Sequence, residues 1–146
     1  MSRCDIKPPR KLWGVLHGLI AVALLAVAPL QVLASDTFAG KWKIVVTPAD
    51  DNAGNEKEFK DTIEFKGDQF TAEVFNKANK FKATKYEGDT RRGPTATFTA
   101  EAKDQKDADG EAKWTGFTTG SEIQGELVWT KADGTEMRYT FKGSKT

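Results

Sequence analysis

The chain has 146 residues, of which 29% are charged, and its formal net charge is +1. This length suits one domain, and the small net charge gives no long-range attraction to nucleic acid or to anionic lipid. A single cysteine, Cys4, excludes a disulfide within the chain.

The first 34 residues have the three parts of a secretory signal peptide. A basic segment, residues 2–11, precedes an apolar segment, residues 12–30, and small or slim side chains lead to Ala34. We expect cleavage after Ala34 and export to the periplasm or out of the cell. The alternative is an uncleaved membrane anchor, because the apolar segment is nearly as long as the roughly 20 residues that span a bilayer. Pro29 favours cleavage, because proline breaks the helix that an anchor needs.

Cleavage would remove four basic residues and one acidic residue, leaving residues 35–146 with 18 basic and 20 acidic residues and a formal charge of about −2. Cys4 and His17, the only cysteine and histidine of the chain, would both be removed. The remaining domain would have no thiol nucleophile, no imidazole base and no His or Cys ligand for zinc or copper. We therefore expect no enzyme, no metal and no cofactor. A hydrolase that uses two carboxylates is the remaining catalytic alternative, but no acidic pair stands out.

Apolar residues recur at every second position after the signal segment, which predicts β-strands. Eight such segments are found, at residues 41–47, 58–66, 69–75, 80–86, 95–101, 111–118, 121–130 and 135–142. Turn dipeptides at Gly67-Asp68, Gly120-Ser121 and Asp133-Gly134 predict tight hairpins, so these neighbouring strands are antiparallel.

The longer connectors, at residues 48–57, 87–94 and 103–110, are polar and too short for a crossover helix. No segment has a convincing helical period, so we expect an all-β, up-and-down arrangement. Every strand has one apolar face and one charged or Thr-rich face. Eight such strands form either a two-sheet sandwich or a closed antiparallel barrel. We expect the eight-stranded barrel, because closure removes the exposed strand edges that invite aggregation.

Gly40-x-Trp42 heads the first expected strand. It resembles the Gly-x-Trp signature of the lipocalins and of the wider calycin group, which includes the avidins and fatty-acid-binding proteins. The resemblance implies that Trp42 closes the barrel floor under an Arg or Lys of the last strand, for which Arg138 or Lys142 is the match. The chain departs from typical lipocalins in having no C-terminal helix after the eighth strand, and it shows no match to a biotin site.

The inward-facing positions carry the candidate ligand-binding residues. They are Phe81, Phe98, Trp114, Trp129, Tyr139, Asp61 and Lys85. The aromatic members either line an apolar pocket or fill the barrel, since each large ring buries about 150–250 Å². Asp61 and Lys85 are charged, so each needs a partner, a ligand or an exit to solvent. We expect both near a barrel mouth or at a bulge.

The function expected from these features is an exported, non-catalytic, lipocalin-like barrel that binds a small apolar ligand in its interior. The alternative is a protein-interaction or inhibitor module with a filled core that acts through its loops. An internal cavity above about 300 Å³ favours the carrier, and a solid interior ends that hypothesis. We expect no nucleic-acid partner and no membrane contact except through an uncleaved signal segment.

Four further side chains are expected on the outside: Phe75, Tyr86, Phe117 and Val128.

Overall fold

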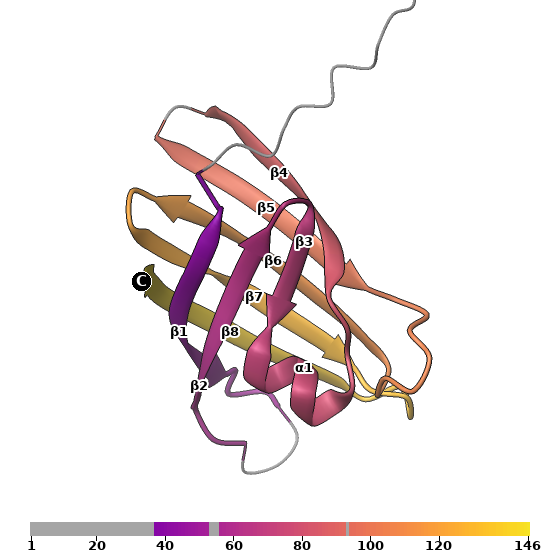
Figure 1. Cartoon of the computed structure of the whole chain (residues 1–146). Coiled ribbons are helices and arrows are strands. Elements are labelled where there is room, and N and C mark those ends of the chain that lie inside the picture. The colour runs from indigo at the N-terminus through magenta and orange to yellow at the C-terminus, as the bar shows by residue number, and fades with distance from the viewer. Residues whose placement is uncertain (1–36, 53–55, 93) are drawn as a thin grey trace, which may run out of the picture. The chain divides into compact units, whose positions relative to one another are not determined.

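The structure is a computed structural model that describes residues 37–52, 56–92 and 94–146. The expected signal segment, its cleavage after Ala34 and the alternative membrane anchor lie outside the described residues. The described chain forms a closed barrel of eight antiparallel strands, each hydrogen-bonded to its neighbours in sequence order (Figure 1). This arrangement confirms the predicted up-and-down barrel and excludes the two-sheet sandwich.

Seven of the eight strands lie within three residues of the predicted limits at either end. The elements are β1 (Gly40–Pro48), β2 (Phe59–Lys66), β3 (Gln69–Ala72), α1 (Glu73–Asn79), β4 (Thr84–Arg92), β5 (Thr95–Ala102), β6 (Glu111–Thr119), β7 (Glu122–Thr130) and β8 (Glu136–Lys145). The barrel closes because β1 pairs with β8 over seven register positions, from Trp42 opposite Lys145 to Pro48 opposite Tyr139. The one helix of the described residues is far too short to cross a membrane.

Three adjoining predictions are wrong. Residues 73–79 form α1 and do not continue the third strand, and the fourth strand begins at Thr84, not at residue 80. β4 also runs through most of residues 87–94, which were predicted as a loop. The helix starts here because the backbone N–H groups of Val74 and Phe75 donate hydrogen bonds to the carboxylate of Asp61, at 2.8 and 2.9 Å. Lys80, with φ of 60°, ends the helix in the left-handed region.

Because of the helix, side chains in and just after it face the opposite way from the prediction. Phe75 and Tyr86, expected outside, are only 3% and 8% exposed. Lys85, expected inside, points outward with its side chain 81% exposed, and its ammonium group lies 3.5 Å from the Asp68 carboxylate. Lys85 is therefore a surface residue, and the prediction of an inward lysine is wrong.

Candidate functional site

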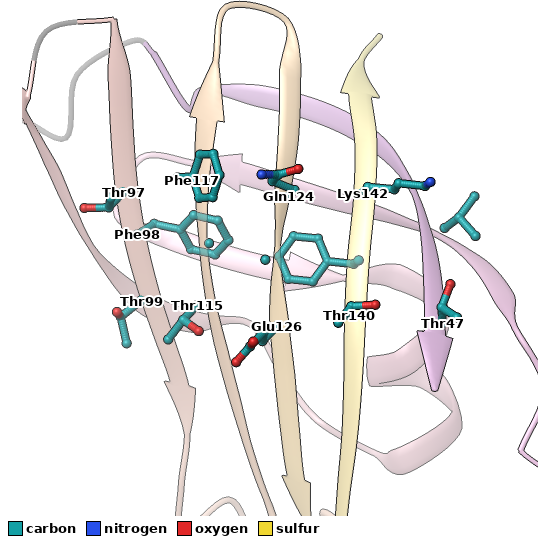
Figure 2. Close-up of a pocket in the computed structure, with 14 residues that line it drawn as sticks. Thr47, Thr97, Phe98, Thr99, Thr115, Phe117, Gln124, Glu126, Thr140 and Lys142 are labelled. Atoms are coloured by element: carbon teal, nitrogen blue, oxygen red, sulfur yellow. The ribbon is translucent and has the colours of Figure 1, made fainter. Parts of the chain in front are cut away.

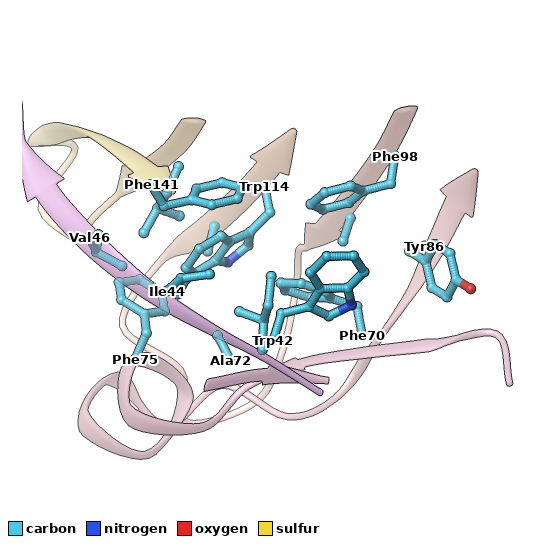
Figure 3. Close-up of a cluster of buried hydrophobic side chains, with 14 of the residues drawn as sticks. Trp42, Ile44, Val46, Phe70, Ala72, Phe75, Tyr86, Phe98, Trp114 and Phe141 are labelled. Carbon is cyan, nitrogen blue, oxygen red and sulfur yellow. The ribbon is translucent and has the colours of Figure 1, made fainter. Parts of the chain in front are cut away.

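The barrel interior is occupied by aromatic rings in mutual contact. Ring centroids lie 5.4 Å apart for Phe70 and Trp114, 5.4 Å for Trp114 and Phe141, and 4.9 Å for Phe65 and Phe98. These separations are those of favourable aromatic pairs. Figure 3 shows side chains from several strands converging in this cluster. The rings therefore fill the middle of the barrel instead of lining an open space.

One end of the barrel is closed by the segment before β1. Phe38 has an exposed fraction of 0%, and its ring lies 5.3 Å from that of Phe65 and 5.9 Å from that of Tyr86. The indole Nε1–H of Trp42 donates a 2.9 Å hydrogen bond to the carbonyl of Phe38. Trp42 thus holds the residue that plugs this end.

The cation over Trp42 is not the one that the sequence suggested. The Nζ atom of Lys145, at the end of β8, lies 5.4 Å from the centre of the Trp42 ring. Arg138 is exposed and binds Glu136 through two of its nitrogens, and Lys142 lines a hollow on the outer face. The last strand does supply the cation, but Arg138 and Lys142 were the wrong choices within it.

The other end is closed by α1 and the loop at residues 103–110, which Figure 1 shows at the same end of the barrel. The rings of Phe75 and Phe81 stack with centroids 5.6 Å apart, and Phe75 meets Trp129 edge to face at 5.5 Å. The Trp129 indole N–H donates to the carbonyl of Asp109 at 2.6 Å. The backbone N–H of Asp109 in turn donates to the carbonyl of Asn79 at 3.0 Å.

The seven predicted ligand-binding residues do not surround one pocket. The five aromatic members belong to the one buried core cluster, in which the Phe75 ring of α1 contacts the rings of Phe81, Trp114 and Trp129. Burial raises the pKa of Tyr139 to about 12, so its phenol stays neutral. As described above, Lys85 lies outside.

Asp61, the remaining predicted residue, is 4% exposed. Its carboxylate accepts hydrogen bonds from the backbone N–H groups of Thr62, Val74 and Phe75. Burial raises its pKa, and these three donors oppose that effect. Its role in the structure is to begin the helix.

A groove of about 760 Å³ lies on the outer face of the barrel, across β5, β6, β7, β8 and β1 (Figure 2). Its walls are two rows of outward side chains that face one another strand by strand. The first row is Thr99, Thr115, Glu126, Thr140 and Thr47. The second row is Thr97, Phe117, Gln124, Lys142 and Val45. Five of the ten side chains are threonines. The other five are two charged residues, Glu126 and Lys142, together with Phe117, Gln124 and Val45.

Two paired glycines form the floor of the groove. Gly116 on β6 faces Gly125 on β7, and both have their open side toward the interior. A Cβ on Gly125 would lie 2.1 Å from the Thr115 carbonyl oxygen and 2.7 Å from the Phe141 ring. Glycine is therefore required here, because the strand and the ring beneath it approach so closely.

A second hollow, of about 660 Å³, adjoins the groove and shares Val45 and Lys142 with it. It extends the outer surface depression over β1 and β2. The sequence alone predicts neither hollow, because its pattern shows the outward threonines only as one face of each strand. Their alignment into rows depends on the register of five strands, which no local pattern contains.

No family model, curated protein or solved structure matches the chain. Within residues 37–52, 56–92 and 94–146, no cluster of three or more His, Cys, Asp or Glu side chains is placed to hold a metal ion. The geometry of the outer groove is therefore the basis for a functional proposal.

Proposed function

We propose that this protein is a non-catalytic binding protein that holds a carbohydrate chain in the groove on the outside of the barrel. The observation that carries the proposal is the pair of side-chain rows across β5, β6, β7, β8 and β1. The Gly40-x-Trp42 signature and the lysine over Trp42 support a calycin-type barrel as the scaffold.

The length of the rows suits an extended ligand. Neighbouring strands lie about 4.8 Å apart, so a row across five strands spans roughly 19 Å. An oligosaccharide of a few sugar units can lie along such a row, with each unit beside a different strand. A compact apolar molecule would use only a small part of it.

The chemistry of the rows also suits a sugar. Threonine hydroxyls and the Gln124 amide both donate and accept hydrogen bonds, and the Glu126 carboxylate accepts them. Phe117 is half-buried in the middle of the second row, where its ring offers an apolar surface for the C–H face of a sugar ring. Ligand sites combine apolar surface with a few fixed polar groups in this way.

Neither of the sites expected from the sequence offers a comparable arrangement. The interior is packed with contacting rings and closed at both ends by Phe38 and α1. The loop at residues 103–110 is engaged in closing one end, through Asp109. The predicted export would place the groove where extracellular polysaccharides are found.

The proposal is tested by isothermal titration of the protein with cellohexaose and with a galacturonate hexasaccharide. Phe117→Ala should weaken binding by about two- to tenfold, because an aromatic contact is lost. Thr115→Val and Thr140→Val should each weaken it further, because a hydroxyl is replaced by a methyl group of the same size. The control is Thr71→Val, on the outer face of β3 and away from the groove.

Two results would contradict the proposal. One is the absence of binding to these two hexasaccharides and to a sulfated heparin hexasaccharide at millimolar concentration. The other is binding that Phe117→Ala and both threonine variants leave unchanged, because the ligand would then lie elsewhere on the barrel.

A further inference from the structure

Three lysines surround Val45 in the second hollow. Lys60 on β2 and Lys142 on β8 face Val45 from its two neighbouring strands. Lys43 lies two residues before Val45 on the same face of β1, and all three lysines line the hollow. Because strands are about 4.8 Å apart, Lys60 and Lys142 extend from backbone positions roughly 10 Å apart.

None of these lysines forms an ion pair with a described residue. Other lysines of the barrel do: Lys85 pairs with Asp68, and both Lys103 and Lys113 pair with Glu101. The hollow is therefore a place where the sheet gathers positive charge without matching it. Like charges held this close repel one another, and a bound anion relieves that repulsion.

The acidic residues near the hollow do not neutralise it. Asp61 contributes to the lining, but its buried carboxylate is occupied by backbone N–H groups. Glu58 accepts a hydrogen bond from Thr47, and Glu126 stands in the neighbouring row, opposite Thr140. Neither glutamate forms an ion pair with the three lysines.

The lysines are continuous with the proposed carbohydrate groove, because Val45 and Lys142 line both hollows. We infer that the ligand is an acidic polysaccharide, whose carboxylate or sulfate groups bind Lys43, Lys60 and Lys142 while its sugar rings lie along the threonine rows. The hydroxyls of Thr62 and Ser144, in the same lining, provide further hydrogen bonds to the anionic group. This inference rests on the proposed function.

The test compares three hexasaccharides in isothermal titration at 50 and 300 mM NaCl: galacturonate, which carries carboxylates, a heparin fragment, which carries sulfates, and neutral cellohexaose. We expect at least one acidic ligand to bind about tenfold more tightly than cellohexaose at low salt. The difference should shrink at high salt, because exposed charges are screened. The stronger of the two acidic ligands identifies the anionic group.

The variant that tests the lysines is the triple change Lys43→Gln, Lys60→Gln and Lys142→Gln. Each exposed charge contributes about two- to fivefold, so the triple variant should lose about tenfold or more for the acidic ligand and little for cellohexaose. The matched control carries Lys66→Gln, Lys77→Gln and Lys106→Gln, which change the net charge equally but lie outside the hollow. Thermal unfolding verifies that both variants fold.

The outcomes separate this inference from the proposed function. If cellohexaose binds as tightly as both acidic ligands, the inference is wrong and the carbohydrate groove stands. The same conclusion follows if the control triple variant loses as much affinity as the test variant. If no hexasaccharide binds, the proposed function itself fails. Tighter binding of a single-stranded DNA oligonucleotide than of either acidic hexasaccharide would also overturn the inference, in favour of a polyphosphate.

Discussion

Asp61 connects β2 to α1 across 13 residues of sequence. Its buried carboxylate supplies the hydrogen-bond acceptors for the first turn of the helix, while the residue before the helix, Ala72, has no side chain that could do so. A helix that begins in this way depends on a residue from another element. Burial and hydrogen bonding act on this carboxylate in opposite directions, and burial is the larger effect on its pKa.

The raised pKa of Asp61 predicts a pH dependence of stability. A carboxyl group whose pKa is higher in the folded state than its ordinary 3.8 binds a proton more readily after folding. Its contribution is therefore fully present below pH 3.8 and is lost as the pH rises through the folded-state pKa. The free energy of unfolding of the native chain, taken relative to Asp61→Asn, should fall over that range.

Urea unfolding at a series of pH values measures this difference. Asp50→Asn, at an exposed loop residue, is the matched control. A difference that instead grows with pH would mean that the three N–H donors outweigh burial and lower the pKa of Asp61.

Thr118 is a second buried polar residue whose surroundings predict an effect on stability. It is fully buried, and its hydroxyl has no hydrogen-bond partner among the described residues. An unsatisfied buried hydroxyl costs about 1–3 kcal/mol. Thr118→Val keeps the shape and removes the hydroxyl, so it should raise the free energy of unfolding by about 1 kcal/mol. Chemical denaturation measures the change, with Thr119→Val on the exposed side as the control, and a loss of stability would refute the expectation.

At the scale of the elements, the strands with strict alternation were predictable and the segment around α1 was not. β5 alternates buried Ala96, Phe98 and Ala100 with half-buried threonines, and its limits were predicted almost to the residue. Residues 69–75 alternate equally well, yet the strand β3 stops at Ala72 and α1 follows it. The strand ends because the carboxylate of Asp61, on β2, binds the N–H groups of Val74 and Phe75. In the local sequence, Asp61 is only an inward charge without a partner.

The candidate site was predictable in its composition but not in its position. The Thr-rich outer faces were visible in the sequence, and so were Gly116 and Gly125. The two glycines leave no room inside the barrel, because the ring of Phe141 lies directly beneath them. Placing five threonines and Phe117 beside one another required the register of the closed sheet, which is a property of the whole barrel.

At the largest scale, the described chain is a barrel plugged at both ends, and these plugs support the proposal of a ligand on the outer surface. Phe38, four residues after the predicted cleavage site at Ala34, seals one end. The opposite end is sealed by α1 and its ring contacts with Phe81 and Trp129. A small apolar ligand would have to displace these contacts before it reached the interior.

The plug at the first end can be tested by Phe38→Ala. Removing a fully buried phenylalanine costs about 3–5 kcal/mol, and Phe38 contacts the rings of Phe65, Tyr86 and Phe98. We expect a loss of that size in urea unfolding, together with new fluorescence from an apolar dye such as anilinonaphthalene sulfonate in the space left behind. Phe117→Ala removes the same side chain from the outer face, where it is only half-buried, and should cost much less stability and bind no dye. Dye uptake by the native chain would instead indicate an accessible interior, and would return the small apolar ligand to the inside of the barrel.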